Sequence, residues 1–259
     1  MPIMQVLLLK VPSPVLGAII ISFAIAFSAV GILFVRRLVH HSKLKTHHDV
    51  VDPILGAAVA LYAVLTAFVV IMVWQNFDKA NSNVQLEANY LADIYRDSEA
   101  FSPEFHQKTG DLLREYRQAV IDHEWKTMRE GNMSPEVETL MRKIWRNYTD
   151  YQPKTVTEQA FFIESVRKLN SFRELRRQRI MESRIGIPGL LWLVLIIGGI
   201  STISFTFFFG AENIKVQLAI SMLLAVTISL ILFTILALDF PFTGDIAVPS
   251  DPFKMVLLD

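Results

Sequence analysis

The sequence predicts an all-α polytopic membrane protein, with four transmembrane helices and a helical extramembrane bundle between helices two and three. Three observations predict this fold class. Hydrophobic residues make up 52% of the 259 residues, although the chain also carries 25 basic and 25 acidic side chains. Those charges are absent from four long runs and concentrated in one polar segment. Within that segment, apolar residues recur at helical intervals.

Each of the four uncharged runs is long enough to cross a bilayer. Residues 11–35, 53–77, 185–211 and 216–238 contain no Asp, Glu, Lys or Arg. A helix needs about 20 apolar residues to cross roughly 30 Å of hydrocarbon, and a helix satisfies its own backbone hydrogen bonds there. The first run is longer than the apolar core of a signal peptide and has only Lys10 before it, so we expect a retained helix.

The polar segment between runs two and three predicts a bundle of helices. Residues 75–187 hold 18 basic and 18 acidic side chains, so the segment is neutral by itself. Ser102-Pro103 and Ser134-Pro135 are typical helix starts, with serine as the cap and proline in the first turn. A last helix is expected from about 155 to 184. We expect two of these helices to prolong transmembrane helices two and three out of the bilayer.

These patterns divide the chain into four parts. Residues 1–77 hold transmembrane helices one and two, 78–184 the charged bundle, 185–240 helices three and four, and 241–259 an extended C-terminal tail. Basic clusters lie on both sides of this topology, so the positive-inside rule leaves the orientation open. The expected location is the inner (plasma) membrane of a bacterium, with the lipid bilayer as one partner.

The sequence offers little that would support catalysis or a cofactor. Zero net charge gives no electrostatic case for binding nucleic acid. No nucleophile–base order, phosphate loop or zinc-protease motif is present, so we expect neither an enzyme nor a cofactor. His123-Glu124 is interpreted as part of a solvated helix face. The weak metal-site candidates are two histidine pairs, for which a basic interfacial loop is the favoured interpretation: His40, His41, His47 and His48.

The transmembrane helices contain no ionisable side chain in mid-bilayer, where proton relays usually place one. Gly198, Gly199 and the hydroxylated residues of helices three and four favour close helix packing over pore lining. Helix two carries a stripe at intervals of i, i+4, i+7 and i+11, which either packs or rings a pore in an oligomer. The stripe consists of Leu61, Leu65, Phe68 and Met72.

Several short segments resemble the bestrophin-like family of membrane proteins. They are the helix-two exit at 74–77, the segments 87–89 and 207–213, the segment 237–245, and residues 251–253. The residues of these segments that match the family pattern include Trp74, Gly210, Glu212, Asp239, Pro241, Phe242, Gly244 and Asp245. The resemblance covers nearly the whole chain and includes the helix order.

This family is distantly similar to bestrophins, which are pentameric anion channels whose second helices line the pore. The resemblance therefore implies a homo-oligomer, and it places the large loop and both termini in the cytoplasm. Calcium-gated bestrophins carry a dense acidic cluster after the matching Pro-Phe motif, whereas here only Asp245 follows closely, flanked by Asp239 and Asp251. A Ca²⁺ ion takes six to eight oxygen ligands. We therefore interpret Asp239 and Asp245 as helix-end and turn residues that stay in water.

Two functions remain open at this stage. The first is an oligomeric ion channel for anions, with the stripe on helix two as its constriction. The second is a non-conducting membrane scaffold or sensor, whose charged bundle docks a soluble partner.

Overall fold

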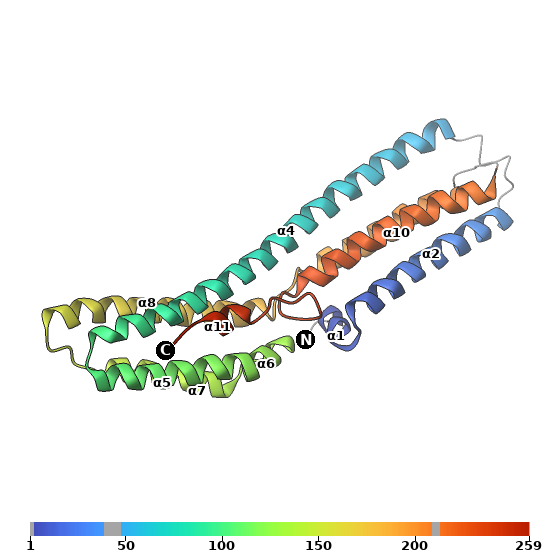
Figure 1. The fold of residues 1–259 in the computed structure, drawn as a ribbon. Helices are drawn as coiled ribbons and strands as arrows, with labels where there is room; N and C mark the ends of the chain where they lie inside the picture. Colours follow the sequence, from blue (N-terminus) through green and yellow to red (C-terminus); the bar gives the residue numbers. More distant parts are fainter. Residues whose placement is uncertain (1–2, 39–47, 209–212, 259) are drawn as a thin grey trace. The chain divides into compact units, whose positions relative to one another are not determined.

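The computed structural model describes residues 3–38, 48–208 and 213–258, and of Ile3 and residues 48–55 the backbone alone. The regular elements of this part of the chain are all helices, in agreement with the predicted fold class (Figure 1). The α-helices are α1 (Ile3–Lys10), α2 (Ser13–Leu38), α4 (His48–Asp97), α5 (Pro103–Ala119), α6 (Trp125–Arg129), α7 (Pro135–Thr149), α8 (Val156–Glu182), α9 (Gly189–Phe205), α10 (Ile214–Asp239) and α11 (Asp251–Met255). The 3-10 turns are η1 (Ser98–Ala100) and η3 (Thr206–Phe208), and η2 (Val120–Glu124) is a π-helical turn.

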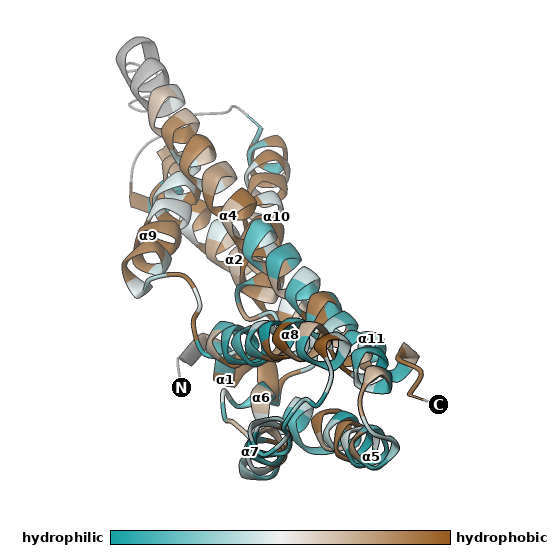
Figure 2. Ribbon diagram, turned by 90° about the vertical axis from the view of Figure 1, so that its left-hand side faces the viewer, coloured by the Kyte–Doolittle hydropathy of each residue, from teal (hydrophilic) through white to brown (hydrophobic). Residues whose placement is uncertain are grey.

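Four helical segments in the described residues are long and apolar enough to cross a membrane, which confirms the prediction. They are α2, the segment Gly56–Ala100, whose uncharged part ends at Phe77, the segment Gly189–Phe208 and α10. Figure 2 shows hydrophobic colouring along α2, α9 and α10 and hydrophilic colouring along α5 and α7. Helix α4 changes from one to the other along its length.

The chain forms two compact units. The membrane unit consists of Lys10–Gln75 and Ile187–Asp239, and therefore holds the four spans. The extramembrane unit consists of Met1–Leu9, Asn76–Gly186 and Phe240–Asp259. Helix α4 contributes to both units, because it is a single helix of 50 residues.

Small residues set the packing distances within the membrane unit. A Cβ atom built on Gly198 of α9 would lie 2.5 Å from the ring of Tyr62 on α4. The Tyr62 hydroxyl donates a hydrogen bond to the carbonyl of Leu195, 3.0 Å away. These contacts confirm that the glycines of the third span serve helix packing.

Gln217 joins three elements at one end of the membrane unit. Its Oε1 accepts hydrogen bonds from Nε and Nη2 of Arg36 at 3.0 and 2.7 Å, and its Nε2 donates to the carbonyl of Thr206 at 3.1 Å. The end of α2, the turn η3 and the start of α10 are thereby linked. The Gln217 side chain is buried, so these bonds replace the water that the amide loses.

The predicted helix starts in the extramembrane unit are confirmed. The hydroxyl oxygens of Ser102, Ser134 and Thr155 accept hydrogen bonds from the backbone N–H groups three residues later. Each bond satisfies a donor that the first turn of a helix leaves without a partner.

Helix α4 prolongs the second span as predicted, but the corresponding prediction for the third span is wrong. Helix α8 ends at Glu182 and α9 begins at Gly189. Pro188 has no N–H group and disfavours a helical residue before it. The N–H of Ile187 donates instead to Oδ1 of Asp239, 2.7 Å away. Two short helices were also missed, α1 and α11, so the C-terminal tail is not extended throughout.

We predict that Gly198→Ala destabilises the membrane unit by about 1–3 kcal/mol, because the added methyl group forces the Tyr62 ring out of its packed position. Thermal unfolding in detergent, followed by circular dichroism, measures the effect. Gly56→Ala is the matched control, because a Cβ on Gly56 meets no atom within 4 Å. Equal losses in both variants would contradict this interpretation.

Candidate functional site: an exposed face of helix α4 and a buried charge network

One face of α4 has no partner among the described residues of the membrane unit. Thr66, Val69 and Val73 are buried on the opposite face. Leu61 and Phe68 are 73% and 68% exposed, and Val64 and Ile71 between them are also more than half exposed. A helix that crosses a membrane with such a face presents it to lipid, to a second copy of the chain or to a pore.

The structure places the four residues of the predicted stripe at two levels of exposure. Leu61 and Phe68 lie on the exposed face, whereas Leu65 and Met72 are half-buried at its edge. Sequence reasoning missed Val64 and Ile71, although their spacing from Phe68, at i−4 and i+3, places them on the same face. Trp74, at the end of the span, is exposed.

Beyond the membrane-spanning part of α4 most of the exposed positions are polar. The exposed polar residues include Gln75, Asn76, Lys79, Ser82 and Asn89, and Leu86, which is 48% exposed, is an apolar residue among them. Amide, hydroxyl and ammonium groups hydrogen-bond ions or their hydration water, which an apolar surface does not. The exposed side of α4 therefore passes from apolar to polar along one continuous helix.

The opposite side of α4 carries a buried carboxylate that is paired with a buried arginine. Glu87 and Arg179 of α8 are both fully buried in the extramembrane unit. Nε of Arg179 donates to Oε2 of Glu87 at 2.7 Å, and Nη2 donates to Oε1 at 2.9 Å. This is the bidentate arrangement that makes arginine–carboxylate pairs strong and directional.

The pair belongs to a larger network of buried charges. Nη2 of Arg179 also donates to Oε2 of Glu124 at 2.9 Å, and Arg176 binds both oxygens of Glu124 at 2.7 and 3.2 Å. Nη1 of Arg176 reaches Glu138 of α7 at 2.6 Å. Four charged side chains, two of each sign, are thus enclosed and mutually neutralised, which is the condition for burying charge at tolerable cost.

Aromatic groups complete the enclosure. The Arg179 guanidinium lies 5.0 Å from the centre of the Trp125 ring and 5.8 Å from that of Phe253. The hydroxyl of Tyr116 donates to Oε1 of Glu87 at 3.1 Å. Burial and the Glu87 charge raise the pKa of Tyr116 well above its ordinary value, so this donor keeps its proton.

The π-helical turn η2 explains why Glu124 faces inward while its neighbour does not. Burial by itself would raise the pKa of Glu124, but Arg179 and Arg176 outweigh it and hold that pKa below its ordinary value. The prediction of a solvated His123-Glu124 face is therefore wrong for Glu124 and right for His123, which is exposed. The inserted residue of a π-turn shifts the register of the helix face, and periodicity alone does not reveal it.

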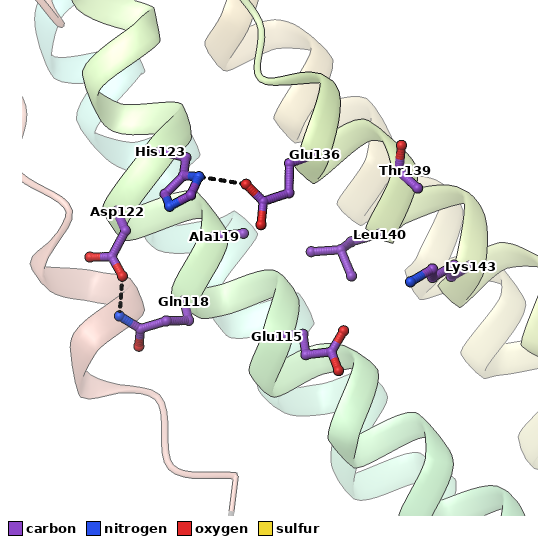
Figure 3. Close-up of a pocket in the computed structure, with 9 residues that line it drawn as sticks. All are labelled: Glu115, Gln118, Ala119, Asp122, His123, Glu136, Thr139, Leu140 and Lys143. Carbon is purple, nitrogen blue, oxygen red and sulfur yellow. Dashed lines mark hydrogen bonds and ion pairs between the residues drawn. The ribbon is translucent and has the colours of Figure 1, made fainter.

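His123 lines an open groove of about 490 Å³ between α5, η2 and α7 (Figure 3). Its Nδ1 lies 2.5 Å from Oε2 of Glu136, across the groove. The other lining residues are Glu115, Gln118, Ala119, Asp122, Thr139, Leu140 and Lys143. No group of three or more potential metal ligands occurs in the part of the chain that the structure describes.

The Pro241-Phe242 motif after α10 and Phe253 of α11 pack over the buried charge network. Phe242 and Phe253 are buried, and both rings lie 5.9 Å from that of Trp125. The carbonyl of Pro241 accepts a hydrogen bond from the N–H of Val248 at 2.7 Å, which closes a loop through Gly244. Gly244 adopts φ of +87°, a conformation that favours glycine.

The two aspartates of this motif behave differently. Asp245 is exposed, as predicted. Asp239 ends α10, as predicted, but the prediction that its carboxylate stays in water is wrong, because the residue is buried and accepts hydrogen bonds from the N–H of Ile187 and, at 3.1 Å, from Nε1 of Trp192. Asp239 therefore fixes the start of α9 within the membrane unit. The Ile187–Pro188 break before α9 was the available signal, since a helix start needs acceptors for its free N–H groups.

Some predicted site residues cannot be placed. His40, His41, His47, Gly210 and Glu212 lie outside the described residues, and of His48 only the backbone is described.

The comparison with known families decides the classification. The family model of the Bestrophin-like domain matches residues 22–253. The chain belongs to the bestrophin-like family. Proteins of the bestrophin family are membrane-embedded ion channels rather than enzymes, and this protein is an integral membrane protein. The family match does not support a soluble partner for the bundle. No curated protein matches the sequence.

Solved structures show the same fold. A bacterial bestrophin homologue from Klebsiella pneumoniae aligns with a TM-score of 0.70 at 10% identity, covering 91% of this chain and 95% of that chain. Two of its point variants align with TM-scores of 0.71 and 0.68 at 10% and 11% identity, covering 91% of this chain and 96% and 97% of theirs. At such low identity the likeness establishes the bestrophin fold alone.

We predict that Arg179→Met destabilises the extramembrane unit by about 3–5 kcal/mol, because it leaves Glu87 and Glu124 as buried carboxylates without their shared partner. Urea unfolding followed by circular dichroism measures the loss. Arg177→Met on the same helix is the control, and we expect it to cost far less, because its pair with Glu174 is exposed. Similar losses in both variants would show that the buried network is not a stabilising element.

We also predict that Glu182→Gln stabilises the protein at neutral pH. Burial raises the pKa of Glu182 above its ordinary value, and its Oε2 is buried without a hydrogen-bond partner among the described residues. The stability contribution of Glu182 is therefore fully present below the unfolded pKa and is lost as pH rises through the folded pKa. Glutamine keeps an acceptor for Nδ2 of Asn83, which lies 2.9 Å from Oε1.

Melting curves between pH 4 and pH 8 test this prediction. The difference between Glu182→Gln and the wild type should be largest at pH 8 and should shrink toward pH 4. Glu174→Gln is the control with the opposite sign, because hydrogen bonds from Arg177 and Gln178 lower the pKa of Glu174. A Glu182→Gln variant that is less stable than the wild type at pH 8 would contradict the assignment.

Proposed function

We propose that this protein is an oligomeric ion channel whose pore is lined by the exposed face of α4. The observation that supports the proposal is the continuity of that face. It is apolar from Leu61 to Ile71, becomes polar at Gln75 and stays largely polar to Asn89. A ring of such helices would enclose a short dry passage in the membrane unit and a wet one in the extramembrane unit.

The constriction is assigned to Leu61 and Phe68, with Leu65 and Met72 on its flank. Phe68 has the largest exposed side chain among the proposed lining residues. Rings of such side chains narrow a pore and exclude water when closed, so the barrier to ions is the cost of dehydrating them. The four uncharged runs contain no ionisable residue, which favours passive conduction over proton-coupled transport.

Anions are the proposed permeant species, because the family resembles anion-conducting bestrophins. By the same resemblance, the bundle and both termini face the cytoplasm, and the subunits form a ring of about five. The proposed location is a bacterial inner membrane.

We predict that Phe68→Ala raises the chloride current severalfold in planar bilayers containing the purified protein, because it removes the bulkiest group of the constriction. Ile220→Ala is the matched control, since Ile220 is a similarly exposed side chain on α10. The reversal potential in a KCl gradient identifies the permeant ion. A reversal potential at the potassium equilibrium potential would show that cations, and not anions, permeate. The absence of current in both the wild type and Phe68→Ala would contradict the proposal that the protein is a channel.

A further inference from the structure

An apolar groove of about 550 Å³ runs along the membrane unit between α2 and the end of α9. Its lining is apolar apart from one serine and includes Phe23, Ala26, Val30, Gly31, Phe34 and Phe207. Phe23, Val30 and Phe34 are all more than half exposed. The groove therefore lies on the outer surface of segments that cross the membrane.

The floor of the groove is fixed by one close contact. A Cβ atom on Gly31 would lie within 3 Å of three atoms of the Phe207 ring, so only glycine lets this ring lie flat against α2. The Phe27 ring packs on Phe207 with a centroid distance of 5.5 Å. Phe207 itself is buried. The hollow is thus part of the packed structure and does not depend on a loose side chain.

The dimensions of the groove fit one leaflet of a bilayer. Phe34 follows Phe23 by eleven positions, which is a rise of about 17 Å along the helix. Half of the hydrocarbon core of a bilayer is about 15 Å. An extended acyl chain that follows the groove would therefore pass from the bilayer centre to the headgroup layer.

A cation lies on the same helix face at one end of the groove. Arg37 follows Val30 and Phe34 at i+7 and i+3, which places all three on one side of α2. Arg37 is exposed, whereas its neighbour Arg36 is bound to Gln217 of α10. The groove thus combines an apolar channel with a guanidinium group where a headgroup would lie.

We propose that this groove binds one acyl chain of an anionic phospholipid, whose phosphate pairs with Arg37. A second copy of the chain is the competing occupant. A phospholipid is favoured because it supplies both an acyl chain that matches the length of the groove and a phosphate at the depth of Arg37.

Lipid retention by the purified full-length protein tests the proposal. The protein is placed in nanodiscs of equal phosphatidylglycerol and phosphatidylcholine, extracted into detergent and analysed by native mass spectrometry. We expect the wild type to retain phosphatidylglycerol preferentially. Arg37→Gln should reduce that preference about fivefold, the factor for one basic residue near a membrane surface, and Arg37→Lys should keep it.

A second substitution fills the groove without changing charge. Ala26→Trp should abolish retention of both lipids, whereas Ala219→Trp, at an exposed alanine of α10 away from the groove, should leave it unchanged. Circular dichroism establishes that each variant is folded. Unchanged retention in both Arg37→Gln and Ala26→Trp would overturn the proposal. A change of oligomeric state in Ala26→Trp, without loss of lipid, would overturn it in favour of a second copy.

Discussion

The bidentate pair between Glu87 and Arg179 is the interaction on which the extramembrane unit depends. It joins α4 to α8, and through Glu124 and Arg176 it reaches η2 and α7. Each of these charges would be costly to bury alone, so the helices that carry them have to be in place together. Trp125 and Phe253 cover Arg179, which makes the C-terminal tail part of the same arrangement. The network specifies which face of α4 turns inward.

The burial of one side of α4 determines which of its residues are exposed. Because Glu87, Leu91 and Ile94 are fixed in the core, the polar residues on the other side of α4 remain exposed. In the membrane unit Thr66, Val69 and Val73 play the corresponding part, with Leu61 and Phe68 left exposed. One uninterrupted helix therefore carries an exposed face that is apolar in one unit and polar in the other. The proposed role of α4 as a pore-lining helix rests on this change of polarity along its exposed face.

The sequence was sufficient for the spans, the caps and the helical bundle, because these follow from charge segregation and local helix chemistry. It did not reveal the buried network, although a signal was present: in α8 the core spacing continues from Leu169 and Phe172 into Arg176 and Arg179. A charged residue at a core position is interpreted as exposed unless its partners are known. The partners of Arg179 are Glu87 and Glu124, which are 92 and 55 residues away from it in sequence. The buried Asp239 was missed for the same reason, since its donors Ile187 and Trp192 are 52 and 47 residues away. The π-turn at Val120–Glu124 was missed because helical periodicity does not reveal it. The pore-lining assignment of Leu61, Leu65, Phe68 and Met72 stays a prediction.

The absence of cysteine from the chain makes that assignment directly testable. Phe68→Cys channels in liposomes are exposed to a charged, membrane-impermeant thiol reagent while current is recorded, with Ile220→Cys at an exposed position of α10 as the control outside the proposed pore. The account predicts that Phe68→Cys reacts and that its current falls, whereas Ile220→Cys does neither. A Phe68→Cys variant that conducts but never reacts would show that the exposed face of α4 lies against lipid or protein and not along a pore.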